Sequence, residues 1–110
     1  MSNDEIKVLM LELSEHLNKA TAIINQLHTN YIEDSRTGAD ILAARIDRNG
    51  DEPFKAKVHC DDLIEVIQTP MEVRERNCDT YPFEYVSNIN GVEFFELCAR
   101  RNEVQANDLV

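Results

Sequence analysis

The sequence contains no glycine-rich loop of the kind that cradles a phosphate group. Its three glycines, Gly38, Gly50 and Gly91, each stand where a turn is expected, and tryptophan is absent. No Cys-x-x-Cys, His-x-x-x-His or serine-nucleophile motif occurs. We therefore expect no cofactor, no bound metal and no catalytic residues, and we predict a protein that is not an enzyme.

Basic residues are scarce: 11 Lys and Arg face 21 Asp and Glu, which gives a formal net charge of −10. A protein that binds bare DNA or RNA needs a cationic surface to displace counterions, so no direct nucleic-acid binding is expected. Anionic lipid would also repel the chain. The acids are spread along the sequence without a block of like charge, which favours a solubilising surface over a dedicated acidic binding face.

The chain also lacks the signals of export and membrane insertion. Asp4 and Glu5 stand where a signal peptide needs bases, and no long apolar run follows. The three cysteines (Cys60, Cys78 and Cys98) are an odd number without the spacing of a disulfide framework. These absences predict a cytoplasmic protein with reduced thiols and no membrane contact.

The first 33 residues carry the pattern of a long amphipathic helix. Ser2 and Glu5 fit a capping box, which satisfies amide groups at the start of a helix. The apolar positions that follow are separated by alternating gaps of four and three residues, a period that keeps one seam facing a partner helix. That seam consists of Ile6, Met10, Leu13, Leu17, Ala20, Ile24, Leu27 and Tyr31.

Two interpretations of this helix stay open. Leu9, Leu11, Ile23 and Ile32 widen the apolar surface beyond the needs of a two-stranded coil, which favours packing on the rest of its own domain. A helix of roughly 28 residues would span about 42 Å, which favours a protruding helix that pairs with a second copy. The candidate residues for a homodimer or partner interface are Ile6, Met10, Leu13, Leu17, Ile24, Leu27 and Tyr31.

Residues 34–110 are predicted to form the β-rich part of a single domain. Asn49-Gly50 is a strong hairpin signal and predicts two short strands around it. The same turn begins like a calcium-binding loop, but Glu52 replaces the required glycine and Val58 the required glutamate. We therefore expect a hairpin here without a calcium site.

The stretch His59-Cys60-Asp61-Asp62 resembles a metal or proton-transfer site. In a strand, however, alternation places Cys60 with the apolar residues and His59 with the neighbouring lysines, on opposite faces. We predict a second strand over residues 63–68, which sets Glu65 opposite His59. His59, Asp61 and Glu65 are therefore weak candidates for a polar site. A competing interpretation makes Asp62 the N-cap of a short helix.

A better helix start follows at Thr69-Pro70, with proline at the first helical position and Glu72 two residues later. This pattern predicts a short helix near residues 70–77.

A hairpin around Asn90-Gly91 is the clearest strand signal in the chain. A three-residue loop would set Tyr85 opposite Phe95 and Glu84 opposite Glu96, whereas a two-residue loop would set Tyr85 opposite Glu96. We favour the three-residue loop, which makes Glu84 and Glu96 weak candidates for an acidic pair.

Together these patterns predict an α+β fold: a long N-terminal helix packed on, or dimerising beside, an antiparallel sheet of four or five strands, with one short helix between strands. The seam and the acidic surface indicate a non-enzymatic protein-binding module, a homodimer that acts as an adaptor or inhibitor of a larger protein. Small acidic domains of this kind are common among phage and mobile-element accessory proteins. The alternatives are a DNA mimic that inhibits a nucleic-acid-binding enzyme, and a metal-dependent enzyme without a recognised motif.

Overall fold

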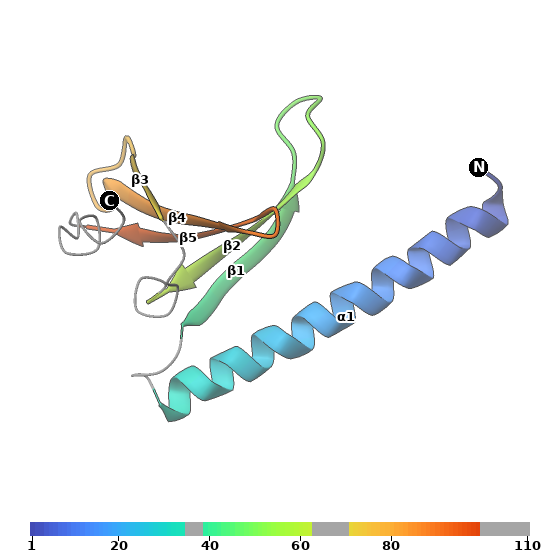
Figure 1. Cartoon of the computed structure of the whole chain (residues 1–110), viewed down its shortest axis with the longest axis horizontal. Helices are drawn as coiled ribbons and strands as arrows, with labels where there is room; N and C mark the ends of the chain where they lie inside the picture. The colour runs from blue at the N-terminus through green and yellow to red at the C-terminus, as the bar shows by residue number, and fades with distance from the viewer. Residues whose placement is uncertain (35–38, 63–70, 100–110) are drawn as a thin grey trace.

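The computed structural model describes residues 1–34, 39–62 and 71–99, and it shows one long helix beside a five-stranded sheet (Figure 1). The predicted α+β class is confirmed. The elements are, in chain order, α1 (Asn3–Glu33), β1 (Asp40–Asp47), β2 (Lys55–Asp61), β3 (Glu72–Glu75), β4 (Phe83–Ile89) and β5 (Val92–Cys98).

The start of α1 is fixed by the predicted capping box. The Ser2 Oγ accepts a hydrogen bond from the Glu5 amide at 3.2 Å and donates one to the Glu5 carboxylate at 3.2 Å. At the other end the Asp34 amide donates to the Asn30 carbonyl at 2.8 Å. The helix has 31 residues, which at 1.5 Å per residue gives a rod about 46 Å long.

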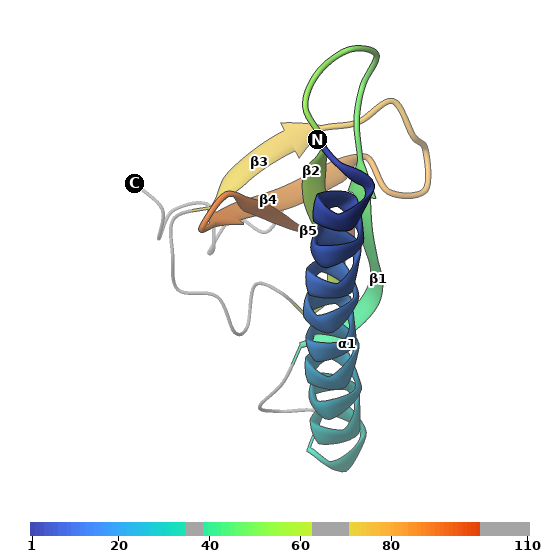
Figure 2. The ribbon, with the colours of Figure 1, turned by 90° about the vertical axis from the view of Figure 1, so that its right-hand side faces the viewer.

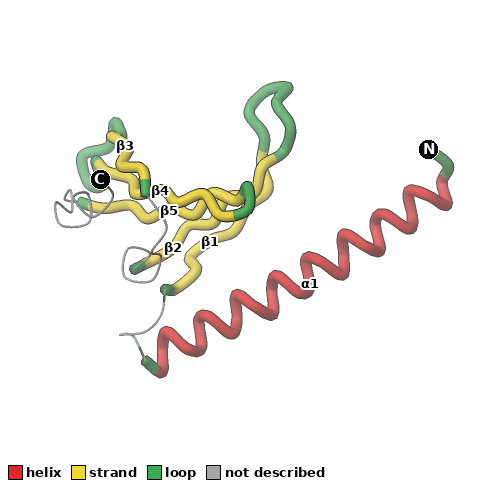
Figure 3. The backbone as a smooth tube through the Cα atoms, viewed as in Figure 1, coloured by secondary structure: helices red, strands yellow, loops and turns green. Residues whose placement is uncertain are grey.

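The sheet consists of two hairpins joined side by side, in the strand order β1-β2-β5-β4-β3 (Figure 3). β1 pairs with β2 and β4 with β5 in antiparallel fashion, and β3 extends the second hairpin at its outer edge. β2 and β5 run parallel, so the prediction of a purely antiparallel sheet is wrong at this one pairing. β5 carries apolar residues on both faces, Phe94 on one and Phe95 and Leu97 on the other. As the middle strand of the sheet, β5 is partly shielded from water on both faces.

The main cluster of buried residues lies on one face of this sheet, which we call the core face, whereas the buried Val86 lies on the opposite face, which we call the polar face. Cys60 is 2% exposed, Tyr85 is fully buried, and Met71 packs with them. The half-buried residues that pack against this group are Ile41, Val58, Val73, Phe94 and Cys98. The predicted alternation in β2 is therefore confirmed, because Cys60 belongs to the core while His59 points to the opposite, polar face.

The register of the C-terminal hairpin differs from the one favoured above. Ile89 pairs with Val92, which leaves a two-residue loop. Asn90 and Gly91 have φ values of 52° and 82°, as a type I′ turn requires at both central positions, and such turns match the twist of the flanking strands. Tyr85 consequently pairs with Glu96, and Glu84 with Leu97. Glu84 and Glu96 thus lie on opposite faces, and the predicted acidic pair is wrong.

The short helix predicted near residues 70–77 is also wrong, because Glu72–Glu75 forms strand β3. Val73 pairs with Tyr85 and packs against the core, while Arg74 pairs with Glu84. Burial of a β-branched residue and a cross-strand ion pair thus outweigh the local capping pattern. Residues 63–70, which include the predicted strand and Glu65, lie outside the described residues.

The helix touches the sheet without covering it. No residue of α1 is buried, and β1 is the strand that it contacts most. Figure 1 shows the helix diverging from the sheet toward its N-terminus, and Figure 2 shows it running along one side of the sheet beside β1. In the described part of the chain, no helix has both the length and the apolar character needed to cross a membrane.

Candidate functional site

Most of the large apolar side chains that are exposed in the described part of the chain belong to α1. Met10, Leu13 and Leu17, at the centre of the predicted seam, are 64%, 54% and 46% exposed. Ile6 and Leu27 are exposed as well, whereas Ile24 and Tyr31 are half-buried beside the sheet. The candidate interface residues therefore form a continuous row along the helix, and most of that row lies in solvent.

The charges of α1 avoid this seam. The positions that flank it carry no carboxylate; they are Lys7, Ser14, Thr21 and His28 on one side and Leu9, His16, Ile23 and Asn30 on the other. All carboxylates of the helix lie outside the seam and its flanks, and they are Asp4, Glu5, Glu12, Glu15 and Glu33. The side of α1 that contains the seam and its flanks therefore carries no carboxylate, although the protein as a whole is acidic.

Two polar contacts fasten the C-terminal third of α1 to the sheet. The His28 Nδ1 lies 2.8 Å from the Asp40 carboxylate at the start of β1. The Tyr31 hydroxyl donates to the Asp62 carboxylate at 2.9 Å. This hydrogen bond, and the negative charge of Asp62, raise the pKa of Tyr31 above its ordinary value of 10.0. The helix is therefore held at one end only among the residues described.

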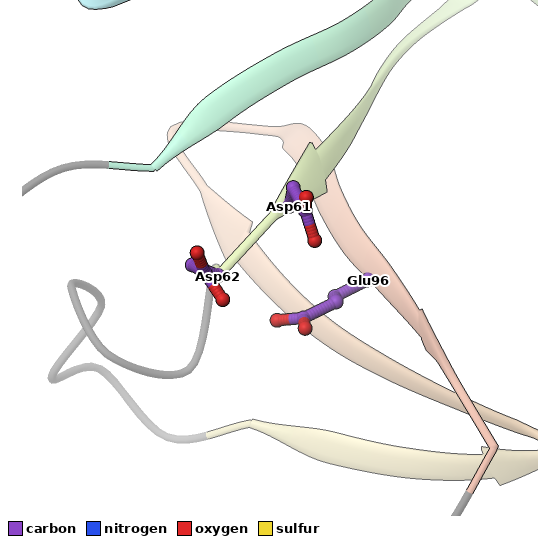
Figure 4. Close-up of side chains that lie close together, drawn as sticks. All are labelled: Asp61, Asp62 and Glu96. Carbon is purple, nitrogen blue, oxygen red and sulfur yellow. The ribbon is translucent and has the colours of Figure 1, made fainter. Parts of the chain in front are cut away.

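Asp61, Asp62 and Glu96 form an acidic cluster where β2 ends next to β5, with carboxylate oxygens within 4.8 Å of one another (Figure 4). Two of these residues, Asp61 and Glu96, are among the weak polar-site candidates from the sequence. Oxygen ligands at this spacing suit Ca²⁺ or Mg²⁺. Exposed groups of acids are nevertheless common without an ion, so the spacing alone does not make this cluster a metal centre.

His59 lies on the polar face, stacked on Phe95 with ring centroids 4.8 Å apart. The two rings line a shallow hollow of about 280 Å³ together with Arg45, Lys57 and Leu97. Both sides of β2 at His59 are occupied, by β1 and by β5. The predicted partner of His59, Glu65, lies outside the described residues.

Glu84 forms ion pairs with two arginines and is not paired with Glu96, the acid that the sequence predicted as its neighbour. Its carboxylate lies 3.7 Å from Arg74 and 3.8 Å from Arg76. Arg74 also donates to Glu72 and to Glu93, each at 3.1 Å. These contacts neutralise the acids of the polar face and connect β3, β4 and β5.

The three free thiols have different environments. Burial raises the pKa of Cys60 to about 12 and that of Cys98 to about 11. The pKa of Cys78 is lowered, first by hydrogen bonds from the Tyr81 and Thr80 amides and then by Arg76. Cys60 and Cys98 therefore act as small core residues, and Cys78 is the thiol whose surroundings favour the thiolate form.

The sequence did not predict Asp62 and Asp40 as partners of α1, nor Phe95 as the partner of His59. Asp62 has a φ of 58° just after β2, and Asp40 lies at the first residue of β1. Each contact joins residues that are distant in the chain, so no local sequence pattern predicts it.

Comparisons with protein-family models, with curated proteins and with solved structures found no match to this chain.

Proposed function

We propose that the protein is a non-enzymatic protein-binding module, an adaptor or inhibitor of a larger protein, whose binding element is α1. The observation that carries this proposal is the row of exposed apolar side chains along the helix. Monomeric soluble proteins rarely expose contiguous apolar patches of more than a few hundred Å², and larger ones mark interaction sites.

The seam has the dimensions of a helix-binding surface. A partner that covers it removes large aliphatic side chains from water, at about 25 cal/mol per Å² of apolar area. A stable interface needs about 800 Å² from each partner, and the surface along one side of a rod about 46 Å long and about 10 Å across is of that order. Recognition through one helix face uses anchors spaced three and four residues apart, which is the spacing of Ile6, Met10, Leu13 and Leu17.

A second copy of the chain is one such partner, so that the module is a homodimer. The uncharged or basic flanks of the seam support this proposal, because two identical seams would meet without repulsion between carboxylates. A cytoplasmic setting suits the three free thiols.

The alternatives have less support from the described residues. A DNA mimic needs rows of free carboxylates, yet Glu72, Glu84 and Glu93 on the polar face are paired with arginines. A metal-dependent enzyme would rest on the acidic cluster alone.

The experiment that tests the proposal compares two leucine substitutions on the same helix. Leu17 lies in the seam, whereas Leu11 lies outside it and is 66% exposed. The tagged protein, its Leu17→Glu variant and its Leu11→Glu variant are used to capture proteins from a lysate of the native host. We expect the same partner with the wild type and with Leu11→Glu, and its loss with Leu17→Glu. A partner that the Leu17→Glu variant still retains, with helix content unchanged by circular dichroism, would overturn the assignment of α1 as the binding element.

A further inference from the structure

We propose that two copies pair through α1 in an antiparallel arrangement, with Leu17 of each copy packed against Ala20 of the other. This inference rests on the proposed function, since it specifies how the same helix face meets a second copy.

In one antiparallel register, every seam residue of one copy faces a seam residue of the other. When residue numbers across the interface add up to 37, each seam residue meets a seam residue of the second copy. The four pairs, each formed twice by the symmetry of the dimer, are Leu17–Ala20, Leu13–Ile24, Met10–Leu27 and Ile6–Tyr31. The symmetry axis then passes between residues 18 and 19. Since α1 spans Asn3–Glu33, the two helices overlap along the seam, and Ile24 and Tyr31, which are half-buried beside their own sheet, offer only their exposed side to the second copy.

Side-chain volume favours the antiparallel arrangement over a parallel one. Ala20 is the only small residue of the seam, and in the antiparallel register it faces Leu17. In a parallel, in-register pair Ala20 would face Ala20, which leaves a void, and Tyr31 would face Tyr31, which crowds the seam. Well-packed interfaces alternate large and small residues across the contact, and voids as well as overpacking weaken them.

Charge also favours this arrangement. The antiparallel register brings Lys7 of one copy opposite His28 of the other, and the His28 ring contacts the carboxylate of Asp40 at 2.8 Å. The Lys7 ammonium thus approaches an existing pair whose carboxylate is negative, at both ends of the dimer.

The placement of the sheets gives a third reason. Each sheet is fastened to the C-terminal third of its helix through His28 and Tyr31. A parallel pair would bring both sheets, with their acidic clusters, to the same end of the dimer. The antiparallel pair places them at opposite ends of a rod about 46 Å long, far beyond the screening distance of about 8 Å at physiological salt.

Disulfide trapping tests the orientation. Leu13→Cys and Ile24→Cys are made separately in a Cys78→Ser background, which removes the most reactive native thiol. In the antiparallel register residue 13 faces residue 24, while like positions lie 11 residues apart, about 16 Å along the axis. That distance is too great for a disulfide, whose Cα atoms must lie within about 7 Å.

Mild oxidation of a mixture of the two variants should therefore give a covalent heterodimer, and each variant alone should stay largely uncrosslinked. Efficient crosslinking of each variant with itself would overturn the antiparallel arrangement in favour of a parallel one.

Two neighbouring alanines test the pairing itself. Ala20 lies in the seam, and Ala22 lies outside it. By analytical ultracentrifugation, Ala20→Lys should weaken the dimer by about a hundredfold or more, because the ammonium would be buried without a partner. Ala22→Lys should leave the dimer unchanged.

A wild-type protein that sediments as a monomer at tens of micromolar would overturn this inference. The proposed function would then be judged separately by the capture experiment, in which a partner lost only with Leu17→Glu still supports it.

Discussion

At the scale of single residues, the structure separates chemical reactivity from the residue types that suggest it. The run His59-Cys60-Asp61-Asp62 looks reactive in the sequence, but its thiol is 2% exposed and lies in the core. The thiol with the lowered pKa is Cys78, outside that run. Local surroundings, and not residue type, determine how readily each cysteine forms a thiolate.

Alkylation should therefore modify Cys78 fastest and Cys60 slowest. With a pKa of about 12, Cys60 is ionised in about one molecule in ten thousand at pH 8, and its burial limits access as well. The measurement is mass spectrometry of the native protein after timed exposure to iodoacetamide. Denatured protein is the control, because unfolding should bring the three rates together. Modification of Cys60 as fast as Cys78 in the native protein would contradict the buried placement of Cys60.

Tyr31 should ionise above its ordinary pKa of 10.0, because its hydroxyl donates to Asp62. The folded pKa is raised, so the neutral form is the one that folding stabilises. This contribution is present below pH 10 and is lost as the pH rises through the raised folded pKa.

The difference in absorbance at 295 nm between the wild type and Tyr31→Phe, followed against pH, isolates this titration. We expect its midpoint above pH 10, and a lower midpoint when the same comparison is made in an Asp62→Asn background. A midpoint that Asp62→Asn leaves unchanged would contradict the hydrogen bond from Tyr31 to Asp62 as the cause of the raised pKa.

Sequence patterns predicted these residues unevenly. The opposite orientations of Cys60 and His59 follow from the period of two in a strand and are confirmed. The contacts of Tyr31 with Asp62, and of His59 with Phe95, depend on which strands and helices become neighbours. The acidic cluster arises in the same way, since Glu96 reaches Asp61 only through the pairing of β2 with β5.

At the scale of elements, turns decide the register of the strands they connect. The favoured three-residue loop at Asn90-Gly91 was wrong because both residues adopt positive φ, the geometry of the two-residue type I′ turn. The residue types of this turn already favour that geometry. The number of aromatic pairs that each register would form proved a poorer guide.

Gly91→Ala should destabilise the protein by about 1 kcal/mol or more, because alanine is strained at a φ of 82°. No atom lies within 4 Å of where its Cβ would be, so the effect comes from the backbone and not from a clash. The matched control is Asn88→Ala, an exposed position on the same hairpin, which should change stability by less than about 0.5 kcal/mol. Urea unfolding of both variants measures the difference, and equal stabilities would contradict the turn assignment.

The long helix and the segment at Glu72–Glu75 show when local patterns succeed. The helix has a capping box and more than three heptads, and its boundaries match the prediction within a residue or two. The segment at Glu72–Glu75 follows the helix-start pattern Thr69-Pro70 in the sequence, yet it pairs with β4 and forms a strand. A short segment follows its neighbours, because tertiary contacts outweigh the small free energies of capping.

At the scale of the whole molecule, charge and apolar surface act against each other. Each chain carries a net charge of −10, so two copies repel, while the seam that we propose joins them carries no carboxylate. Salt screens the repulsion and leaves the apolar contact intact.

Raising the salt concentration from about 20 mM to about 300 mM should therefore strengthen self-association, since the Debye length falls from about 20 Å to less than 10 Å. The measurement is sedimentation equilibrium at several protein concentrations in each buffer. Ala22→Lys, which lies outside the seam, should follow the same trend as the wild type. A dimer that dissociates as salt rises would instead indicate an interface held by ion pairs.

The arrangement of the sheet also has consequences for how the chain folds. Each hairpin is local, and hairpins form in roughly 1–10 μs. The parallel pairing of Val58 with Phe94 connects positions 36 residues apart in the sequence, and no turn favours it. Long-range pairing of this kind loses the entropy of loop closure before any stabilising contact forms. We therefore expect the two hairpins to form quickly and to associate slowly, so that the pairing of β2 with β5 is the rate-limiting step of folding. A substitution at Val58 should slow folding, while a substitution in the solvent-exposed half of α1 should leave the rate unchanged.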